Sequence, residues 1–197
     1  MCGRYQIASE EGIIEIREII DEVNERYKNT PALSAMKTGE ISPAEIAPIL
    51  ISGIDKPQAK LMKWGFPKWD GKGVVINSRS ETAFEKKAFR SSLLNRRCVI
   101  PTTGFFEWQK RDGGKSKFLF RLPETKMLYL AGLYEKSPIE DTYVIMTTAA
   151  NPFISLYHDR MPLILEPDMI RAWLSSTEFA LEYIQQPCHA ALEATAV

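Results

Sequence analysis

Cys2 carries the chemistry that is easiest to identify, because the chain begins Met-Cys-Gly-Arg-Tyr. A small residue at position 2 generally permits removal of Met1. Cys2 would then carry a free α-amine beside its thiol, and both groups titrate only a little above neutral pH. Such an aminothiol can activate its own thiol toward an amide, or it can close on an aldehyde to form a five-membered thiazolidine. The N-terminus alone leaves both chemistries open.

Polar residues at the ends of predicted strands are candidates for the groups that must surround Cys2. Amide cleavage needs an oxyanion hole, whereas aldehyde capture needs acid/base groups that remove water. Asn77 closes the apolar run GVVIN, Arg79 follows in NSRSET, and His158 lies in YHDRMPLIL as one of two histidines. On pattern alone, a single histidine is more often structural or exposed than catalytic.

Glu107 is a further candidate because it lies inside GFFEW, where it is flanked by aromatic residues. The pattern favours a side chain that points outward to water. An inward-facing Glu107 would instead have a raised pKa, which suits a group that transfers protons near neutral pH. The residues leave both orientations open.

Charge is balanced overall but unevenly distributed. The chain has 25 Lys and Arg against 25 Asp and Glu, yet fifteen of the basic and five of the acidic residues lie between positions 60 and 121. The balance argues against a uniformly basic nucleic-acid coat protein or a polybasic membrane binder. The basic middle third is typical of a face that meets a polyanion. A solvated basic face opposite an acidic helix is the alternative.

Cysteine content and hydropathy indicate a reducing compartment. The three cysteines form no CxxC pair, so they predict neither a disulfide framework nor a metal site, and no other motif calls for a cofactor. We find no apolar signal core and no run of ~20 apolar residues. We therefore expect a cytoplasmic protein without a membrane partner.

Apolar periodicity predicts one α+β domain over residues 1–197. Helices are expected at 9–27, 81–95 and 167–185, the first capped by Ser9, with residues 28–45 forming a loop. The predicted strands are 46–52, 60–66, 73–77, 97–100, 105–109, 117–122, 127–134 and 142–148. Such closely spaced strands favour a curved, largely antiparallel sheet or barrel-like core with flanking helices. No coiled-coil seam is evident, so we expect a monomer.

Eight short motifs, in order along nearly the whole chain, resemble those of one family. They are MCGRY at position 1, WGF at Trp64, NSRSET at Asn77, RRCVIP at Arg96, TGFFEW at Thr103, AGLYE at Ala131, TTAAN at Thr147 and HDRMP at His158. Together they resemble the SOS-response-associated peptidase (SRAP) proteins, which process abasic sites in single-stranded DNA. No single motif is decisive, but their common order makes chance a poor explanation.

The resemblance implies a role for each candidate residue. Met1 would be removed, and Cys2 would form a stable thiazolidine with the ring-opened aldehyde of the abasic site. By motif position, Asn77 would position the sugar and the amine, Glu107 would serve the acid/base steps, and His158 would assist Schiff-base chemistry and its reversal.

The resemblance also implies a DNA partner. Arg4 and Arg79 would hold phosphates beside the lesion, and Trp64 would stack on a base. The partner would be single-stranded DNA that contains abasic sites, and the protein would be nucleoid-associated when acting on it. No metal and no cofactor would be required.

The chain departs from the family pattern after the first predicted helix. The family usually has an Asn-x-Ala-Pro-Thr element there, whereas this chain reads EISPAE from Glu40, keeping Pro43 but losing the Asn and the Thr. NSRSE also replaces the commoner NARSE, and GFFEW replaces GFYEW. Contacts made by the divergent element in the family are therefore not carried over.

Alternatives in other functional classes stay open. One alternative is an N-terminal nucleophile amidohydrolase, because glutamine amidotransferases of one class also begin Met-Cys-Gly, although they usually continue with an aliphatic residue where this chain has Arg4. A peptidase would use Cys2 with Glu107 and His158 to cleave a peptide bond, in the narrowest case that of Met1. A non-catalytic reader of single-stranded or modified DNA would make no chemical use of Cys2.

Overall fold

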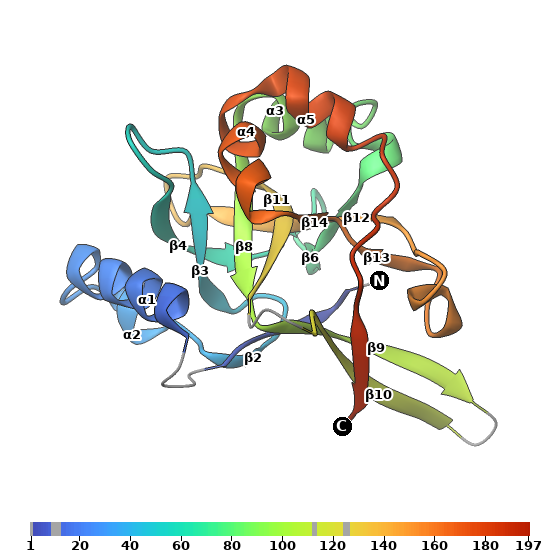
Figure 1. The fold of residues 1–197 in the computed structure, drawn as a ribbon. Helices are drawn as coiled ribbons and strands as arrows, with labels where there is room; N and C mark the ends of the chain where they lie inside the picture. The colour runs from blue at the N-terminus through green and yellow to red at the C-terminus, as the bar shows by residue number, and fades with distance from the viewer. Residues whose placement is uncertain (1, 9–12, 112–113, 124–126) are drawn as a thin grey trace.

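The structure is a computed structural model that describes residues 2–8, 13–111, 114–123 and 127–197 (Figure 1). Its helices are α1 (Ile14–Arg26), α2 (Pro31–Ser34), α3 (Lys87–Asn95), α4 (Ile170–Ser175) and α5 (Thr177–Tyr183). Short 3-10 turns are η1 (Ser80–Thr82), η2 (Ile154–Leu156) and η3 (Pro167–Met169).

The strands form two main sheets and one short pair. In the first half of the chain they are β1 (Arg4–Ile7), β2 (Gly39–Ile41), β3 (Ile46–Ile51), β4 (Gln58–Trp64), β5 (Phe66–Pro67), β6 (Val74–Val75) and β7 (Asn77–Arg79). In the second half they are β8 (Arg97–Thr102), β9 (Gly104–Arg111), β10 (Gly114–Arg121), β11 (Leu128–Glu135), β12 (Thr142–Ala149), β13 (Arg160–Pro162), β14 (Ile164–Leu165) and β15 (Glu193–Ala196).

The larger sheet closes on itself. Its path runs β12-β4-β3-β8-β11, and β11 pairs back with β12, so five strands form a ring. The pairing of β12 with β4 is parallel, and the other pairings around the ring are antiparallel. Strands β7 and β13 extend the pairing of β12 beyond the ring. The predicted α+β fold with a curved, largely antiparallel, barrel-like core is therefore confirmed.

The second sheet lies beside the ring and is antiparallel throughout, in the order β15-β10-β9-β1-β2. Its longest members, β9 and β10, form a hairpin that projects from the body of the molecule (Figure 1). The N-terminal strand β1 lies between β2 and β9, so the residues that follow Cys2 are paired along both edges.

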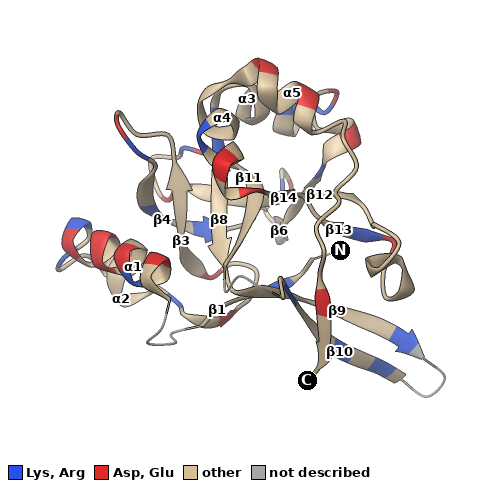
Figure 2. Ribbon diagram, in the orientation of Figure 1, with Lys and Arg blue, Asp and Glu red and all other residues tan. Residues whose placement is uncertain are grey.

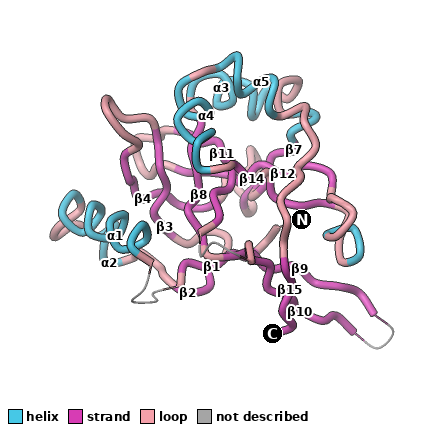
Figure 3. Tube along the Cα trace, in the orientation of Figure 1, coloured by secondary structure: helices cyan, strands magenta, loops and turns pink. Residues whose placement is uncertain are grey.

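Alternate residues of the ring strands are buried in two different clusters. Ile49 and Cys98 belong to a cluster that the ring shares with the second sheet, whereas their neighbours Leu50 and Val99 belong to a cluster beneath the helices. Both faces of these strands are therefore apolar, which explains why their sequences read as continuous apolar runs. In Figure 3 the helices lie around a strand-rich body, with α3, α4 and α5 together at one end and α1 and α2 at another.

Two predicted helices differ from the structure at their boundaries, and in one of them a local cap overrides the apolar period. The predicted helix 167–185 is broken at Ser176, whose backbone is extended and whose side chain accepts a hydrogen bond from Phe179 N as the cap of α5. The predicted helix 81–95 begins only at Lys87, after η1. The predicted cap Ser9 lies outside the described residues.

The segment 28–45, predicted as a loop, contains α2 and β2. Thr30 caps α2 by accepting a hydrogen bond from Leu33 N at 3.4 Å, and Pro31 occupies its first turn. Strand β2 forms because Ile41 pairs with Tyr5 of β1. A cap followed by proline was visible in the sequence, but the partner of β2 lies more than thirty residues away.

Two absences concern the described residues only. Among them no helix is both long and apolar enough to cross a membrane. The same part of the chain holds no group of three or more His, Cys, Asp and Glu side chains placed to bind a metal ion.

Trp173 joins the helical layer to the ring, so we predict that Trp173→Ala lowers the free energy of unfolding by about 3–5 kcal/mol. Its side chain is fully buried, and its Nε1 donates a hydrogen bond to Cys98 O at 2.9 Å. Trp69 is the matched control, since its side chain is 99% exposed. Urea unfolding should show a change within about 0.5 kcal/mol for Trp69→Ala. Similar losses for both variants would contradict the assignment.

Candidate functional site

Cys2 lies immediately before β1 and is fully buried in the cluster that the ring shares with the second sheet. Its Sγ donates a hydrogen bond to Arg4 O, with the two atoms 3.6 Å apart. Burial raises the pKa of the thiol, and the nearby Glu107 carboxylate raises it further. The thiol is therefore neutral near pH 7, and a group that takes its proton would be needed to make it a strong nucleophile.

Glu107 points into the molecule, so the outward orientation favoured by the sequence pattern is wrong. The side chain is only 2% exposed, and in the β9–β10 ladder it lies opposite Phe118, which faces the core. Its neighbours Phe106 and Trp108 lie on the other face, where Lys117 Nζ sits 4.1 Å and 5.7 Å from their ring centroids. The cation on the outer face explains why aromatic residues can flank an inward carboxylate.

A buried pair of tyrosines joins the strand that follows Cys2 to the ring. The hydroxyl groups of Tyr5 in β1 and Tyr143 in β12 are 2.5 Å apart, and burial raises the pKa of both. Both phenols therefore stay neutral near pH 7. This hydrogen bond holds β1, and with it Cys2, against β12. Strand β12 also pairs with β7, which carries Asn77, and with β13, which follows His158.

Trp64 is part of the same aromatic group and is fully buried. Its ring packs edge-on against Tyr5 and is stacked with Tyr143, with centroids 5.2 Å and 6.4 Å away. Its Nε1 donates a hydrogen bond to Ile76 O at 3.0 Å. The sequence-based role of Trp64 as a base-stacking platform is therefore not carried forward, because neighbouring side chains cover the ring.

Asn77 begins β7 and is brought to the edge of the ring by pairing with Ile145 of β12. Its Nδ2 lies 3.5 Å from Ile145 O, whereas its buried Oδ1 has no protein hydrogen-bond partner within the described residues. The same holds there for the hydroxyl oxygens of Ser78, Ser80 and Thr82. Buried polar atoms are usually hydrogen-bonded, so such a row of acceptors and donors is typical of a site that meets solvent or a ligand.

A bidentate ion pair ties this row to the HDRMP motif. Arg160 Nη1 and Nη2 donate to the two carboxylate oxygens of Glu81 at 2.5 Å and 2.9 Å, and Nη2 also donates to Thr147 O at 2.7 Å. Hydrogen bonding to Arg160 lowers the pKa of Glu81, so the carboxylate stays charged near neutral pH. Two stretches far apart in sequence are thereby held together across β12.

His158 lies two residues before β13, and its Nδ1 has two polar neighbours. Nδ1 accepts a hydrogen bond from Arg160 N at 3.0 Å and lies 2.8 Å from Asp159 Oδ1. One ring nitrogen cannot accept from an N–H and donate to a carboxylate at the same time. The Arg160 contact suits an Nδ1 without a proton, whereas the Asp159 contact suits an Nδ1–H. The surroundings of Nδ1 therefore accommodate more than one placement of the ring protons.

Tyr157 places the His158 loop against the strand pair that carries Glu107. The Tyr157 ring meets Phe118 edge-on, with centroids 4.8 Å apart. Phe118 is the residue that pairs with Glu107 in the β9–β10 ladder. Tyr157, which directly precedes His158, therefore packs against the pairing partner of Glu107. The loop that carries His158 therefore packs against the β9–β10 pair at the ladder position of Glu107.

Arg4 and Arg79 are both open to solvent. Arg4 lies in β1 with its side chain partly exposed, and its Nε forms an ion pair with Glu40 Oε1 at 3.5 Å. Arg79 ends β7, two residues after Asn77, and is exposed. Either guanidinium group could therefore contact an external anion, although Arg4 already has an acidic partner.

The whole chain, residues 1–197, matches the family model for SOS response associated peptidase (SRAP). This protein belongs to the SRAP family. The abasic site processing protein YoaM of Bacillus subtilis is 33% identical over 198 residues, which span 94% of this chain and 84% of YoaM. The abasic site processing protein YoqW of Bacillus phage SPbeta is 33% identical over 199 residues, which span 94% of this chain and 85% of YoqW.

A solved structure is similar in fold. A protein from Bacteroides thetaiotaomicron matches with a TM-score of 0.77 at 21% identity, covering 100% of this chain and 92% of its own. At that identity the likeness concerns the fold alone. The family resemblance inferred from the eight motifs is confirmed by the family match and by the relatives at 33% identity.

Sequence reasoning about this SRAP protein missed Trp69. The residue lies in the turn between β5 and β6, eight positions before Asn77, and its side chain is 99% exposed. Lys68 and Lys72 flank it in the same turn. A signal was present, since a tryptophan among Lys, Asp and Gly residues is unlikely to belong to a core. Arg160 was also missed, although both it and Glu81 lie in motifs that the sequence shows.

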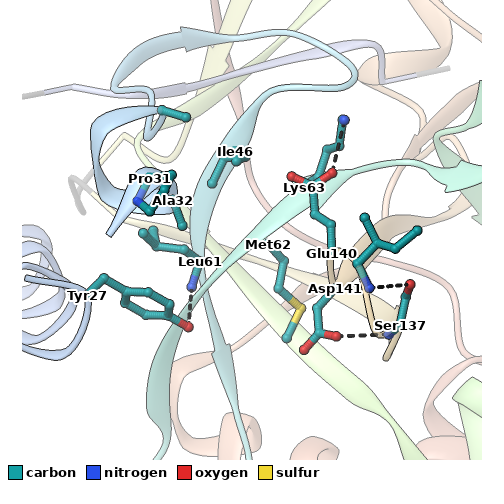
Figure 4. A pocket seen from close by; sticks show the side chains of 12 residues that line it. Tyr27, Pro31, Ala32, Ile46, Leu61, Met62, Lys63, Ser137, Glu140 and Asp141 are labelled. Carbon is teal, nitrogen blue, oxygen red and sulfur yellow. Dashed lines mark hydrogen bonds and ion pairs between the residues drawn. The ribbon is translucent and has the colours of Figure 1, made fainter. Parts of the chain in front are cut away.

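A pocket of about 570 Å³ lies away from these residues (Figure 4). Its walls come from Tyr27 just after α1, from α2, β3 and β4, and from the 137–141 turn. Polar groups along it are engaged within the protein: Leu61 N donates to Tyr27 Oη at 3.2 Å, and Lys63 pairs with Glu140 at 3.0 Å. None of the sequence-predicted site residues lines this pocket.

The electrostatic effect of Glu107 on Cys2 predicts a specific pH response. Because the carboxylate raises the pKa of the thiol, Glu107→Gln should move the pH profile of Cys2 alkylation to lower pH. Iodoacetamide labelling across a pH series, resolved by peptide mass spectrometry, measures this shift. Cys98 is an internal control, because burial alone raises its pKa and its profile should not move. A Cys2 profile that is unchanged, or that moves to higher pH, would contradict this electrostatic effect of Glu107.

Proposed function

We propose that this SRAP protein processes abasic sites in single-stranded DNA by capturing the lesion covalently on Cys2. Two lines of support converge. Its relatives at 33% identity are named abasic site processing proteins. The residue that the chemistry needs, a cysteine next to the initiator methionine, is fixed beside a buried carboxylate, and that placement carries the proposal.

The proposed capture is a condensation in two steps. After Met1 is removed, the α-amine of Cys2 adds to the aldehyde of the ring-opened abasic site, and loss of water leaves an imine. The thiol then adds to the imine carbon, a C–S bond forms, and the thiol proton ends on the nitrogen. The net reaction joins an aldehyde and an aminothiol into a thiazolidine plus one water, without any oxidant, metal or cofactor.

Three side chains are proposed to move protons and to hold the reacting groups. Glu107 takes the proton that the amine loses on adding to the aldehyde and gives it to the departing water; in the second step it takes the thiol proton and passes it to the nitrogen, since its carboxylate already influences the thiol electrostatically. His158 assists formation and reversal of the imine, in keeping with a ring nitrogen that has both a hydrogen-bond donor and an acceptor beside it. Asn77 positions the sugar and the amine through its amide, whose Oδ1 is not used by the described residues.

DNA binding is proposed to rest on arginines and on an exposed aromatic residue. Arg4 and Arg79 would contact phosphates next to the lesion, which makes affinity depend on salt but not on base sequence. Trp69 would take the stacking role that burial denies to Trp64. Figure 2 shows basic residues on the β9–β10 hairpin and acidic residues along α1. The hairpin would therefore attract a polyanion such as DNA, and α1 would repel it.

Intact-mass measurement before and after incubation with an abasic single-stranded oligonucleotide tests the proposal directly. Protein that lacks Met1 should gain the mass of the oligonucleotide less one water, whereas protein that retains Met1 should bind without an adduct because its Cys2 amine is acylated. Cys2→Ala should give no adduct. An adduct of equal yield with Cys2→Ala would show that another nucleophile reacts, and binding without any adduct would favour a non-catalytic reader.

Trp69→Ala should weaken binding of single-stranded DNA by about 1–3 kcal/mol, the cost of losing one stacked base. Fluorescence anisotropy with an undamaged labelled oligonucleotide measures the change. Trp69→Phe is the matched variant that keeps an aromatic face, and it should retain most of the affinity. Equal affinity for Trp69→Ala and the parent protein would remove Trp69 from the binding surface.

A further inference from the structure

Glu40 occupies a position between two cations on the outer face of the second sheet. Its Oε1 lies 3.5 Å from Arg4 Nε, and its Oε2 accepts a hydrogen bond from Lys117 Nζ at 2.6 Å. The three residues come from β2, β1 and β10, so the contact joins three strands of one sheet. Both carboxylate oxygens are used, each by a different cation.

These two cations are otherwise suited to an external phosphate. The side chains of Arg4, Lys117 and Glu40 are 35%, 26% and 41% exposed, so solvent and ligands can reach them. The guanidinium of Arg4 is oriented by a second bond, from Nη1 to Gly3 O at 2.8 Å. The ammonium of Lys117 is placed over the ring of Phe106. A carboxylate that bridges two such groups fills the position that a phosphate would take.

The backbone that carries Glu40 is held by the second sheet. Glu40 is the middle residue of β2 and lies opposite Gln6 in the pairing of β2 with β1. Its side chain is therefore presented from a paired strand, next to Arg4 of the neighbouring strand. A neutral side chain at position 40 would remove one negative charge beside Arg4 and leave the strand pairing in place.

We propose that Glu40 is an affinity-determining residue that competes with DNA phosphates for Arg4 and Lys117. A phosphate can engage these cations only when the carboxylate is displaced, because the two anions repel each other in the same place. Partly exposed ion pairs are weak, so displacement is possible but lowers the net affinity. This inference rests on the proposed function, since it assumes that Arg4 faces DNA.

The test compares Glu40→Gln with Glu140→Gln. Both remove one negative charge, but Glu140 pairs with Lys63, away from the second sheet, at 3.0 Å. Fluorescence anisotropy with an undamaged single-stranded oligonucleotide at several salt concentrations reports affinity without any covalent step. We expect Glu40→Gln to bind roughly three- to tenfold more tightly at low salt, the range that release of one exposed ion-pair network allows. Glu140→Gln should stay within about twofold of the parent protein.

The salt dependence adds a second readout. If two further phosphate contacts form in Glu40→Gln, the plot of log affinity against log salt should steepen by as much as about 1.4, since each contact on a single strand contributes about 0.7. In a background that carries both Arg4→Met and Lys117→Met, the gain from Glu40→Gln should disappear. Affinity equal to or below that of the parent protein, or a gain that persists in this background, would overturn the proposal.

Adduct formation separates this inference from the proposed function. At saturating abasic oligonucleotide, Glu40→Gln and the parent protein should reach the same adduct yield, because Glu40 is proposed to act on binding and not on the reacting groups. A parent protein that binds DNA but forms no adduct would refute covalent capture and would leave the affinity comparison as a valid test of Glu40. A lower saturated yield for Glu40→Gln would instead make Glu40 a support of the reacting groups and overturn the proposal.

Discussion

The structure depends on the ability of one strand, β12, to pair along both edges with different partners in its two halves. Residues Thr142 and Tyr143 pair with β4, and the next residues along the same edge, from Ile145, pair with β7. On the other edge, the first half of β12 pairs with β11 and the second half pairs with β13. The first half therefore closes the ring, and the second half carries strands that lead to Asn77 and His158. The pairing of β12 therefore both closes the core and places the candidate site residues.

The same strand holds the residues that follow Cys2 in place, although residues near chain ends are commonly mobile. Strand β1 is hydrogen-bonded on both sides within the second sheet, and Tyr5 is tied to Tyr143 of β12. A nucleophile that is the first residue of a processed chain gains fixed geometry only if the following residues are held in this way. The buried tyrosine pair thus fixes the position of Cys2 relative to β12, just as the pairing of β7 with β12 fixes the position of Asn77.

The chain's local patterns predicted the fold class and most strand cores, because strands buried on both faces give continuous apolar runs. They failed at β1 and β2, whose pairing depends on residues far apart, and at Ser176, where a cap interrupts an apolar period. Motif order supplied the candidate residues but not their orientation. The burial of Trp64 depends on tertiary contacts such as stacking with Tyr143. The inward orientation of Glu107 likewise depends on Lys117, which lies over the aromatic neighbours of Glu107 on the other face.

Burial of Cys2 beside Glu107 has a chemical consequence under the proposed function. A neutral thiol next to a carboxylate is a poor nucleophile, so it reacts slowly with unrelated electrophiles. Condensation of the α-amine with an aldehyde would place an iminium cation in the same surroundings. That positive charge offsets the effect of the carboxylate and lowers the pKa of the thiol. The arrangement would therefore make the thiol reactive only after the amine has captured its substrate. The order of the two steps would then follow from electrostatics, without a conformational change.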